Sequence, residues 1–80
     1  MVDMNRIQIL KEINKIFIDI IEDKDVVISE STTAEDIDEW DSLTHIQVVI
    51  EIEKKFNKKF TSAEILSWKS VEDMINGIEK

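Results

Sequence analysis

Residues 39–47 read E-W-D-S-L-T-H-I-Q, and the chain changes character inside this stretch. Before it, the sequence is acidic and its apolar residues follow no regular spacing. After it, apolar residues recur at three- and four-residue steps, which is the spacing of one helix face. Asp41 is a good N-cap, because its carboxylate can accept hydrogen bonds from the free N–H groups of a first helical turn. The stretch therefore predicts a helix that begins at Ser42.

The helix after Asp41 is predicted to be amphipathic. Branched residues would also suit a strand, but the strand alternation fails at residues 48–50. Residues 57–59 (N-K-K) end it. Its expected apolar residues are Leu43, Ile46, Val49, Ile50 and Phe56, with Val48 and Ile52 widening the stripe. Its expected water-facing residues are Thr44, Gln47, Glu51 and Lys54.

A second long helix is predicted on the N-terminal side, capped by Asp3. Residues 23–40 then lose the helical spacing and predict a long ordered loop, with one turn begun by Thr33 and Asp36 at capping-box spacing. The helix is expected to keep Gln8, Lys11, Lys15 and Asp19 outside. Its expected apolar face is Ile7, Leu10, Ile13, Phe17, Ile20 and Ile21, and the expected loop anchors are Val26, Val27, Ile28 and Ile37.

Two more helical starts follow. Residues 61–64 (T-S-A-E) form a capping box that opens a short piece burying Ile65, Leu66 and Trp68. Residues 70–73 (S-V-E-D) open a final helix, and Gly77 stands where its last turn could unwind. The apolar residues on one face of that helix are Val71, Met74, Ile75 and Ile78. The sum predicts an all-α bundle of three to four helices with a long loop between the first two.

The bulk composition bounds the class of protein. Eighty residues make one small domain, residues 1–80, and 42% hydrophobic residues suffice for a core without disulfides or metal. The chain contains no cysteine, which indicates a non-oxidising compartment. It shows no secretory signal pattern, and its apolar runs are too short to cross a membrane. We expect a cytoplasmic monomer.

The net charge of −8 is concentrated before Ser42. Residues 19–41 hold ten acidic residues against Lys24 alone, so this acidic segment accounts for all of the excess charge. A field of this sign repels nucleic acid and attracts basic protein surfaces. The segment therefore predicts basic protein partners, and a solvated loop that serves only solubility is the alternative.

Ser42 is predicted to be exposed at the first helical position. Backbone N–H groups without partners and the positive end of the helix dipole favour an anion there, so a phosphate ester on this hydroxyl would be stabilised. Spacing alone also allows Ser42 to be an ordinary helix-start residue.

With D-S-L at the head of its second helix, the chain resembles the acyl carrier proteins and related phosphopantetheine-carrying modules. The likeness covers nearly the whole chain, including residues 40–43 (W-D-S-L), Phe56, residues 60–61 (F-T) and residues 70–71 (S-V). It implies that a separate magnesium-dependent transferase attaches phosphopantetheine from coenzyme A to Ser42. The arm's thiol would then hold an acyl group as a thioester, so this chain is a carrier and not an enzyme.

The resemblance also implies roles for the neighbours of Ser42. Asp41 matches the acid that helps the transferase bind its metal and place the hydroxyl, and Leu43 matches an apolar residue that packs beneath and touches the transferase. Acyl-activating and acyl-transferring enzymes with basic surfaces are the other implied partners. The expected partner-binding residues are Asp38, Glu39, Trp40, Leu43, His45, Ile46, Gln47 and Glu53, with His45 as a surface residue near the arm.

The chain departs from the family pattern at several positions. Glu39 stands where glycine is frequent, and Thr44, Gln47 and Lys54 replace acids of the fatty acid carriers, although Glu53 is retained. These departures favour a free-standing carrier of a specialised fatty acid- or polyketide-type pathway. Trp40 also fits an aminoacyl or peptidyl carrier, which is the alternative. An acidic helical interaction module without a prosthetic group is the alternative of another class.

Two other kinds of site are weighed and set aside. Asp41, Ser42 and His45 lie too close on one helical turn for a hydrolytic triad, which needs the acid on the far side of the imidazole and an oxyanion hole. A calcium loop starting at Asp36 would need an oxygen ligand at Trp40, glycine at Asp41 and glutamate at Gln47. No metal site is therefore predicted, and loose cation binding by the acidic segment is left open.

The aromatic residues are predicted to anchor the core. For Trp40 and Trp68 two alternatives remain open, a half-exposed patch recognised by a partner and a wall against which cargo rests. These two residues, with Phe17, Phe56 and Phe60, are the aromatic residues of the chain.

Overall fold

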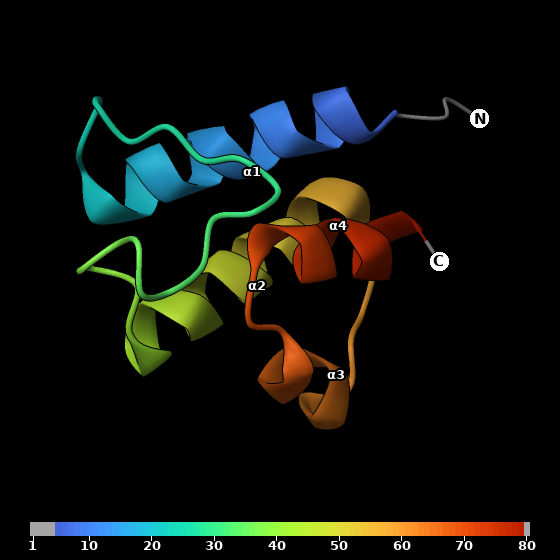
Figure 1. The fold of residues 1–80 in the computed structure, drawn as a ribbon. Coiled ribbons are helices and arrows are strands. Elements are labelled where there is room, and N and C mark those ends of the chain that lie inside the picture. Colours follow the sequence, from blue (N-terminus) through green and yellow to red (C-terminus); the bar gives the residue numbers. More distant parts are fainter. Residues whose placement is uncertain (1–4, 80) are drawn as a thin grey trace.

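The computed structural model describes residues 5–79, which form four helices and no strand. The helices are α1 (Arg6–Ile21), α2 (Ser42–Phe56), α3 (Ser62–Ser67) and α4 (Val71–Glu79). α1 packs against both α2 and α4, while α3 lies apart below them (Figure 1). The all-α bundle with a long loop between the first two helices is therefore confirmed. None of the helices in residues 5–79 is both long and apolar enough to cross a membrane.

α1 begins with a reciprocal cap formed by Asn5. The Asn5 side chain accepts a hydrogen bond from the Gln8 backbone N–H at 2.9 Å, and the Gln8 side chain accepts one from the Asn5 N–H at 3.1 Å. The predicted cap, Asp3, lies outside the described residues. Ile9, Ile13 and Phe17 form the buried face, so the expectation that Ile7 is buried is wrong, because Ile7 is 66% exposed.

The loop between α1 and α2 is held in place by bonds to α1 and to α4. The Asn14 side chain donates to the Val26 carbonyl and accepts from the Ile28 N–H, and Arg6 pairs with Glu30 at 2.7 Å. The predicted turn at Thr33 is present, because the Thr33 N–H donates to the Asp36 carboxylate at 2.9 Å. Ile28 is buried as expected.

Val27 does not anchor this loop, because it is 85% exposed. The loop also completes the start of α4. The Thr32 and Glu30 carbonyls accept hydrogen bonds from the Val71 and Glu72 N–H groups, both at 2.9 Å. These two helix donors would otherwise lack partners. The loop therefore connects α1 to α4 by backbone bonds.

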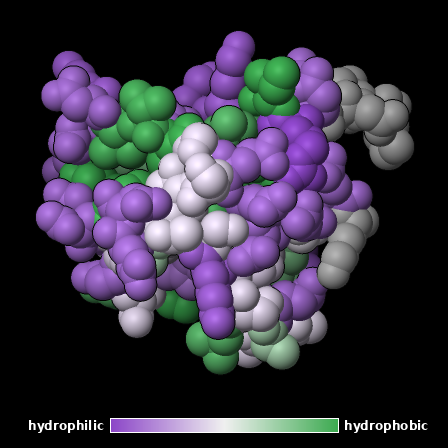
Figure 2. All heavy atoms as spheres, viewed as in Figure 1, coloured by the Kyte–Doolittle hydropathy of each residue, from purple (hydrophilic) through white to green (hydrophobic). Residues whose placement is uncertain are grey.

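The core is one cluster of buried apolar side chains from α1, α2, α4, the loop and the end of α3. Its members are Ile9, Ile13, Phe17, Ile28, Trp40, Val48, Val49, Ile52, Trp68, Val71, Met74, Ile75 and Ile78. The predicted face of α4 and the predicted burial of both tryptophans are confirmed. On the face seen in Figure 2, hydrophobic residues form separate patches between hydrophilic ones.

α2 buries only part of the expected apolar stripe. Its buried residues are Val48, Val49 and Ile52, whereas Leu43, Ile46 and Ile50 are 68%, 45% and 44% exposed. The helix has apolar residues on two faces, and only packing against α1 selects one of them. Asn57 ends α2 in the left-handed conformation with φ of 54°, as its sequence predicts.

α3 buries none of its own six residues. Its Thr61–Glu64 capping box is present, but the predicted burial of Leu66 is wrong, because Leu66 is 77% exposed. Trp68, directly after the helix, is the residue that enters the core. So short a helix has little apolar surface to bury, and side-chain contacts hold it in place.

Gly77 lies inside α4 and is buried, so the expectation that it unwinds the last turn is wrong. A Cβ at this position would lie 2.8 Å from Cζ2 of Trp68. The glycine is therefore a packing residue that lets the Trp68 ring approach the helix backbone.

We predict that Gly77→Ala destabilises the protein by about 1 kcal/mol. The gain of about 1 kcal/mol in helix propensity is smaller than the cost of about 1–3 kcal/mol for forcing a methyl group against a packed ring. Urea unfolding followed by circular dichroism measures the change. Glu72→Ala, on the exposed side of α4, is the control and should change stability by less than about 0.5 kcal/mol. An unchanged or raised stability of Gly77→Ala would show that the ring has room to move.

Candidate functional site

The start of α2 presents Ser42 to solvent. Asp41 has extended backbone angles, and its carboxylate accepts a hydrogen bond from the Thr44 N–H at 2.8 Å. The first helical bond runs from the His45 N–H to the Asp41 carbonyl at 2.8 Å. Ser42 is thus the first helical residue and is exposed, as predicted. Its hydroxyl lies at the positive end of a helix of 15 residues.

The cap keeps Asp41 ionised next to Ser42. The pKa of Asp41 is lowered from its ordinary value of 3.8, first by the hydrogen bond from the Thr44 backbone N–H and next by the Thr44 side chain. The Asp41 and Leu43 N–H groups add to the effect. A fixed negative charge therefore adjoins the serine hydroxyl.

His45 uses both of its ring nitrogens inside the protein. Nδ1 accepts a hydrogen bond from the Trp40 indole N–H at 3.1 Å, and Nε2 lies 3.0 Å from the Ile65 carbonyl oxygen. An indole N–H can only donate and a carbonyl can only accept, so the ring is neutral with its proton on Nε2. We call these two bonds the His45 clasp. They join the loop, α2 and α3.

His45 is therefore not the simple surface residue that was expected, and its contact with partners stays a prediction. Its ring is half-buried, and it lies three, four and seven residues before Val48, Val49 and Ile52, on the buried face of α2. That spacing was the available signal, although the residues that bond to the ring follow only from the tertiary fold.

The clasp sits at the centre of a row of aromatic rings, in the order Phe17, Trp40, His45, Trp68 and Phe60. Ring centroids along this aromatic row are separated by 5.0, 6.0, 6.3 and 4.9 Å. Trp40 and Trp68 are only 5% and 9% exposed. The row runs from α1 through the loop and α2 to Trp68, directly after α3, and to Phe60, before α3. It therefore supports the first turns of α2, the helix that carries Ser42.

A shallow hollow of about 350 Å³ adjoins Ser42 and is open to solvent. The aromatic row forms part of its wall. Its lining residues are Ala34, Trp40, Asp41, Ser42, His45 and Trp68. The hydroxyl of Ser42 therefore borders both bulk water and a partly apolar surface.

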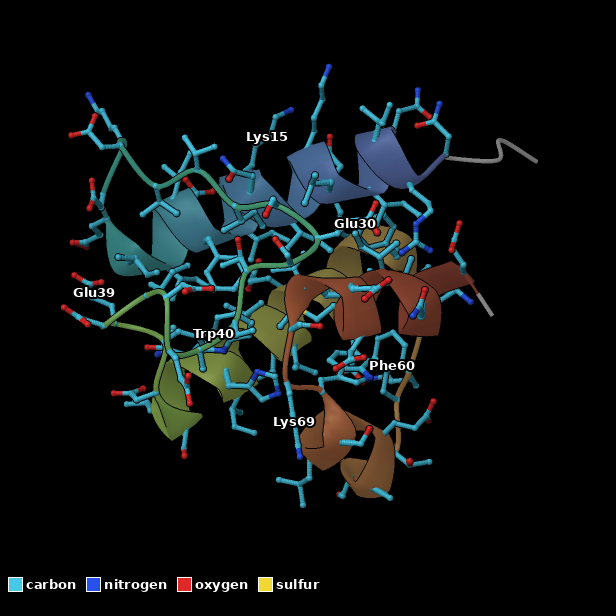
Figure 3. All side chains as sticks on the ribbon, in the orientation of Figure 1. Lys15, Glu30, Glu39, Trp40, Phe60 and Lys69 are labelled. Atoms are coloured by element: carbon cyan, nitrogen blue, oxygen red, sulfur yellow. The ribbon has the colours of Figure 1, made fainter. Side chains whose placement is uncertain are left out.

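The structure divides the predicted partner-binding residues into two groups. Asp38, Glu39, Leu43, Ile46 and Gln47 are exposed. In Figure 3, Glu39 points outward at the edge of the molecule, while its neighbour Trp40 lies among the helices. The exposed side chains of this group surround Ser42 on the loop and on the first turns of α2.

The second group has internal roles. Trp40 is buried and bonded to His45, so its ring is not presented to a partner. Glu53 is half-buried and accepts a hydrogen bond from the Phe60 N–H at 2.9 Å, which holds the connection into α3. Leu43, which belongs to the exposed group, was expected to pack beneath the site but is 68% exposed.

Comparison with known proteins decides the family. Residues 7–78 match the family model described as phosphopantetheine attachment site. The chain belongs to this family. No curated protein matches it. The fold is similar to the solution structure of a holo acyl carrier protein from Geobacter metallireducens, with a TM-score of 0.80 and 31% sequence identity over 88% of this chain and 80% of that one.

The protein is therefore a carrier of the acyl carrier protein type, without catalytic activity of its own, and its cofactor is covalently attached phosphopantetheine. The residues at the start of α2 fit that group. A serine oxygen is exposed there, backbone donors and the helix dipole favour a phosphate, and the hollow leaves room for an arm. When attached, the group supplies the thiol that this cysteine-free chain lacks.

We predict that the Asp41→Asn variant loses less stability than the wild-type protein as the pH falls into the acidic range. Because the folded-state pKa of Asp41 is lowered, its carboxylate contributes stability above its unfolded pKa and loses that contribution as the pH falls through the lower folded value. Asparagine caps helices about as well but does not titrate. Thermal unfolding of both proteins across the acidic range should give a smaller drop for Asp41→Asn. Parallel curves would show that the cap bond does not depend on charge.

Proposed function

We propose that Ser42 is the residue of this carrier that receives phosphopantetheine. The observation that carries the proposal is the exposed Ser42 hydroxyl at the first position of α2, directly behind the Asp41 cap. In the transfer, the serine oxygen bonds to the phosphorus of phosphopantetheine as the pyrophosphate bond of coenzyme A breaks. The nucleotide leaves and the hydroxyl proton is released.

Asp41 has a defined place in this proposal. Its carboxylate is ionised and adjacent to Ser42 along the chain, so it can help a transferase hold Mg²⁺ close to the reacting oxygen. Ser42 supplies the nucleophilic oxygen as a substrate. The transferase supplies the metal site and the catalysis.

The chain contains a matched comparison for Ser42. Ser62 is also exposed and also the first residue of a helix, behind the Thr61 cap. Its helix has only six residues and its N-cap is the uncharged Thr61, whereas Ser42 directly follows an ionised carboxylate. The two serines therefore differ in their surroundings while sharing exposure and helix position.

We predict that the protein gains the mass of one phosphopantetheine when incubated with coenzyme A, Mg²⁺ and a broad-specificity transferase. Ser42→Ala should gain none, because it lacks the oxygen that forms the ester. Ser62→Ala should still gain one. Intact-mass spectrometry measures the mass of all three proteins after the incubation. A modified Ser42→Ala, or an unmodified wild-type protein, would refute Ser42 as the attachment residue.

We further propose that partners bind the exposed residues around Ser42. Leu43, Ile46 and Ile50 are spaced by three and four residues and form one exposed apolar row on α2. Asp38 and Glu39 provide negative charge on the loop next to it. A partner surface with apolar groups and basic residues fits this combination, in agreement with the implied transferase and acyl-handling enzymes.

We predict that Leu43→Ala lowers kcat/KM for loading by the transferase about tenfold, because truncating an apolar anchor at an interface costs more than about 1 kcal/mol. Ile7→Ala is the control, since Ile7 on α1 is exposed to nearly the same extent, 66% against 68%. Neither change should alter thermal stability appreciably. Equal loading of both variants would place Leu43 outside the transferase contact.

We propose that the pathway is a specialised one. Thr44, Gln47 and Lys54 reduce the negative charge of α2, where Glu51 is the exposed acidic residue, and more exposed acidic residues lie on the preceding loop. Partners evolved for an acidic second helix would meet a different charge pattern here. The aminoacyl or peptidyl alternative differs in the enzyme that charges the arm. Loading assays with acyl ligases and with adenylation enzymes would distinguish the two.

A further inference from the structure

The wall of the hollow beside Ser42 is closed toward the core. Trp40 and Trp68 form part of this wall and are almost fully buried, and the half-buried ring of His45 lies between them. An acyl chain that starts from the arm on Ser42 and runs through the hollow toward the buried side chains of α2 therefore meets this part of the aromatic row. Entering the core along this route would require these rings to separate.

The His45 clasp opposes that separation. Moving the rings apart breaks the bond from Trp40 at 3.1 Å or the bond to the Ile65 carbonyl at 3.0 Å. An apolar chain entering the gap offers neither a donor nor an acceptor in exchange. The separated polar groups would then be desolvated without partners, which is the costly outcome for a hydrogen bond.

The rings also have little space to retreat. Trp40 is backed by Phe17, whose ring centroid lies 5.0 Å away. Trp68 lies so close to α4 that a Cβ on Gly77 would come within 2.8 Å of its ring. Phe60 packs on Trp68 from another direction, at 4.9 Å. Both sides of the clasp therefore rest on packed core.

From this geometry we propose that the carrier keeps its cargo outside the four helices, with the arm lying along the open hollow, and that the His45 clasp excludes an acyl chain from the core. This inference rests on the proposed attachment at Ser42. It assigns to the carrier short or polar acyl groups, including aminoacyl groups, which lose little by remaining in water. A long saturated chain would be left exposed.

The test compares two cargoes on the same serine. The transferase loads Ser42 from acetyl-CoA or from octanoyl-CoA, and mass spectrometry verifies each product. NMR then records the indole N–H signals of Trp40 and Trp68 and the methyl signals of Val48 and Ile52. Both loaded forms should give the same signals at these positions, and hydroxylamine should cleave both thioesters at the same rate. Methyl shifts or slower cleavage specific to the octanoyl form would overturn the proposal.

Two variants test the clasp itself. His45→Ala removes both bonds, and Trp40→Phe removes only the indole donor while keeping an aromatic ring, so it serves if His45→Ala does not fold. In the folded variants, the octanoyl thioester should become more resistant to hydroxylamine than the acetyl thioester. Lys54→Ala, on the exposed side of α2, should behave as wild type. If the folded variants still keep the octanoyl chain out of the core, the proposed role of the His45 clasp is refuted. If Ser42 cannot be loaded at all, the proposed function is refuted.

Discussion

The two hydrogen bonds of His45 are the constraint on which the site depends. They connect the loop through Trp40 and α3 through Ile65 to the first turns of α2. α3 buries none of its own residues, so its position relies on this contact, on Trp68 and on the bond between Glu53 and Phe60. Together with Ile65, which packs against the core, they fix the position of α3 relative to α2 and the loop.

The same arrangement separates rigid from reactive parts. Aromatic rings and buried aliphatic residues fix the base of α2, while Ser42 and Leu43 remain in water. A carrier needs this division, because its attachment point must be recognised by several enzymes and its arm must move between them. Under the proposed attachment at Ser42, the cofactor supplies the thiol, and the protein has only to position one hydroxyl and present a surface.

Charge and packing act at different places in the molecule. The acidic segment leads up to Ser42 and places exposed negative charge on the loop beside it. Farther from Ser42, Arg6 of α1 pairs with Glu30 of the loop and with Glu79 of α4, and so joins the two ends of the described chain. These partly exposed pairs each contribute little, and the buried face of α1 against α2 and α4 contributes more to stability.

Local chemistry made much of this protein readable from its sequence. Asp41, Thr61 and Asn57 define helix ends through bonds within three or four residues, so capping and the exposure of Ser42 followed without knowledge of the fold. α4 has its large apolar residues on one face, and all four of those predicted to be buried are buried, although the burial of Gly77 was not predicted. Between caps, the spacing fixed helix type and approximate length.

Tertiary structure decided the remainder. α2 has apolar residues on two faces, and packing against α1 buried Val48 and Ile52 while leaving Ile46 and Ile50 exposed. Gly77 became a contact for Trp68, and His45 became a clasp rather than a surface residue, because their partners lie 9 and 20 residues away along the chain. Sequence spacing governs neighbours on one helix, but it cannot tell which distant ring or carbonyl the folded chain will bring beside them.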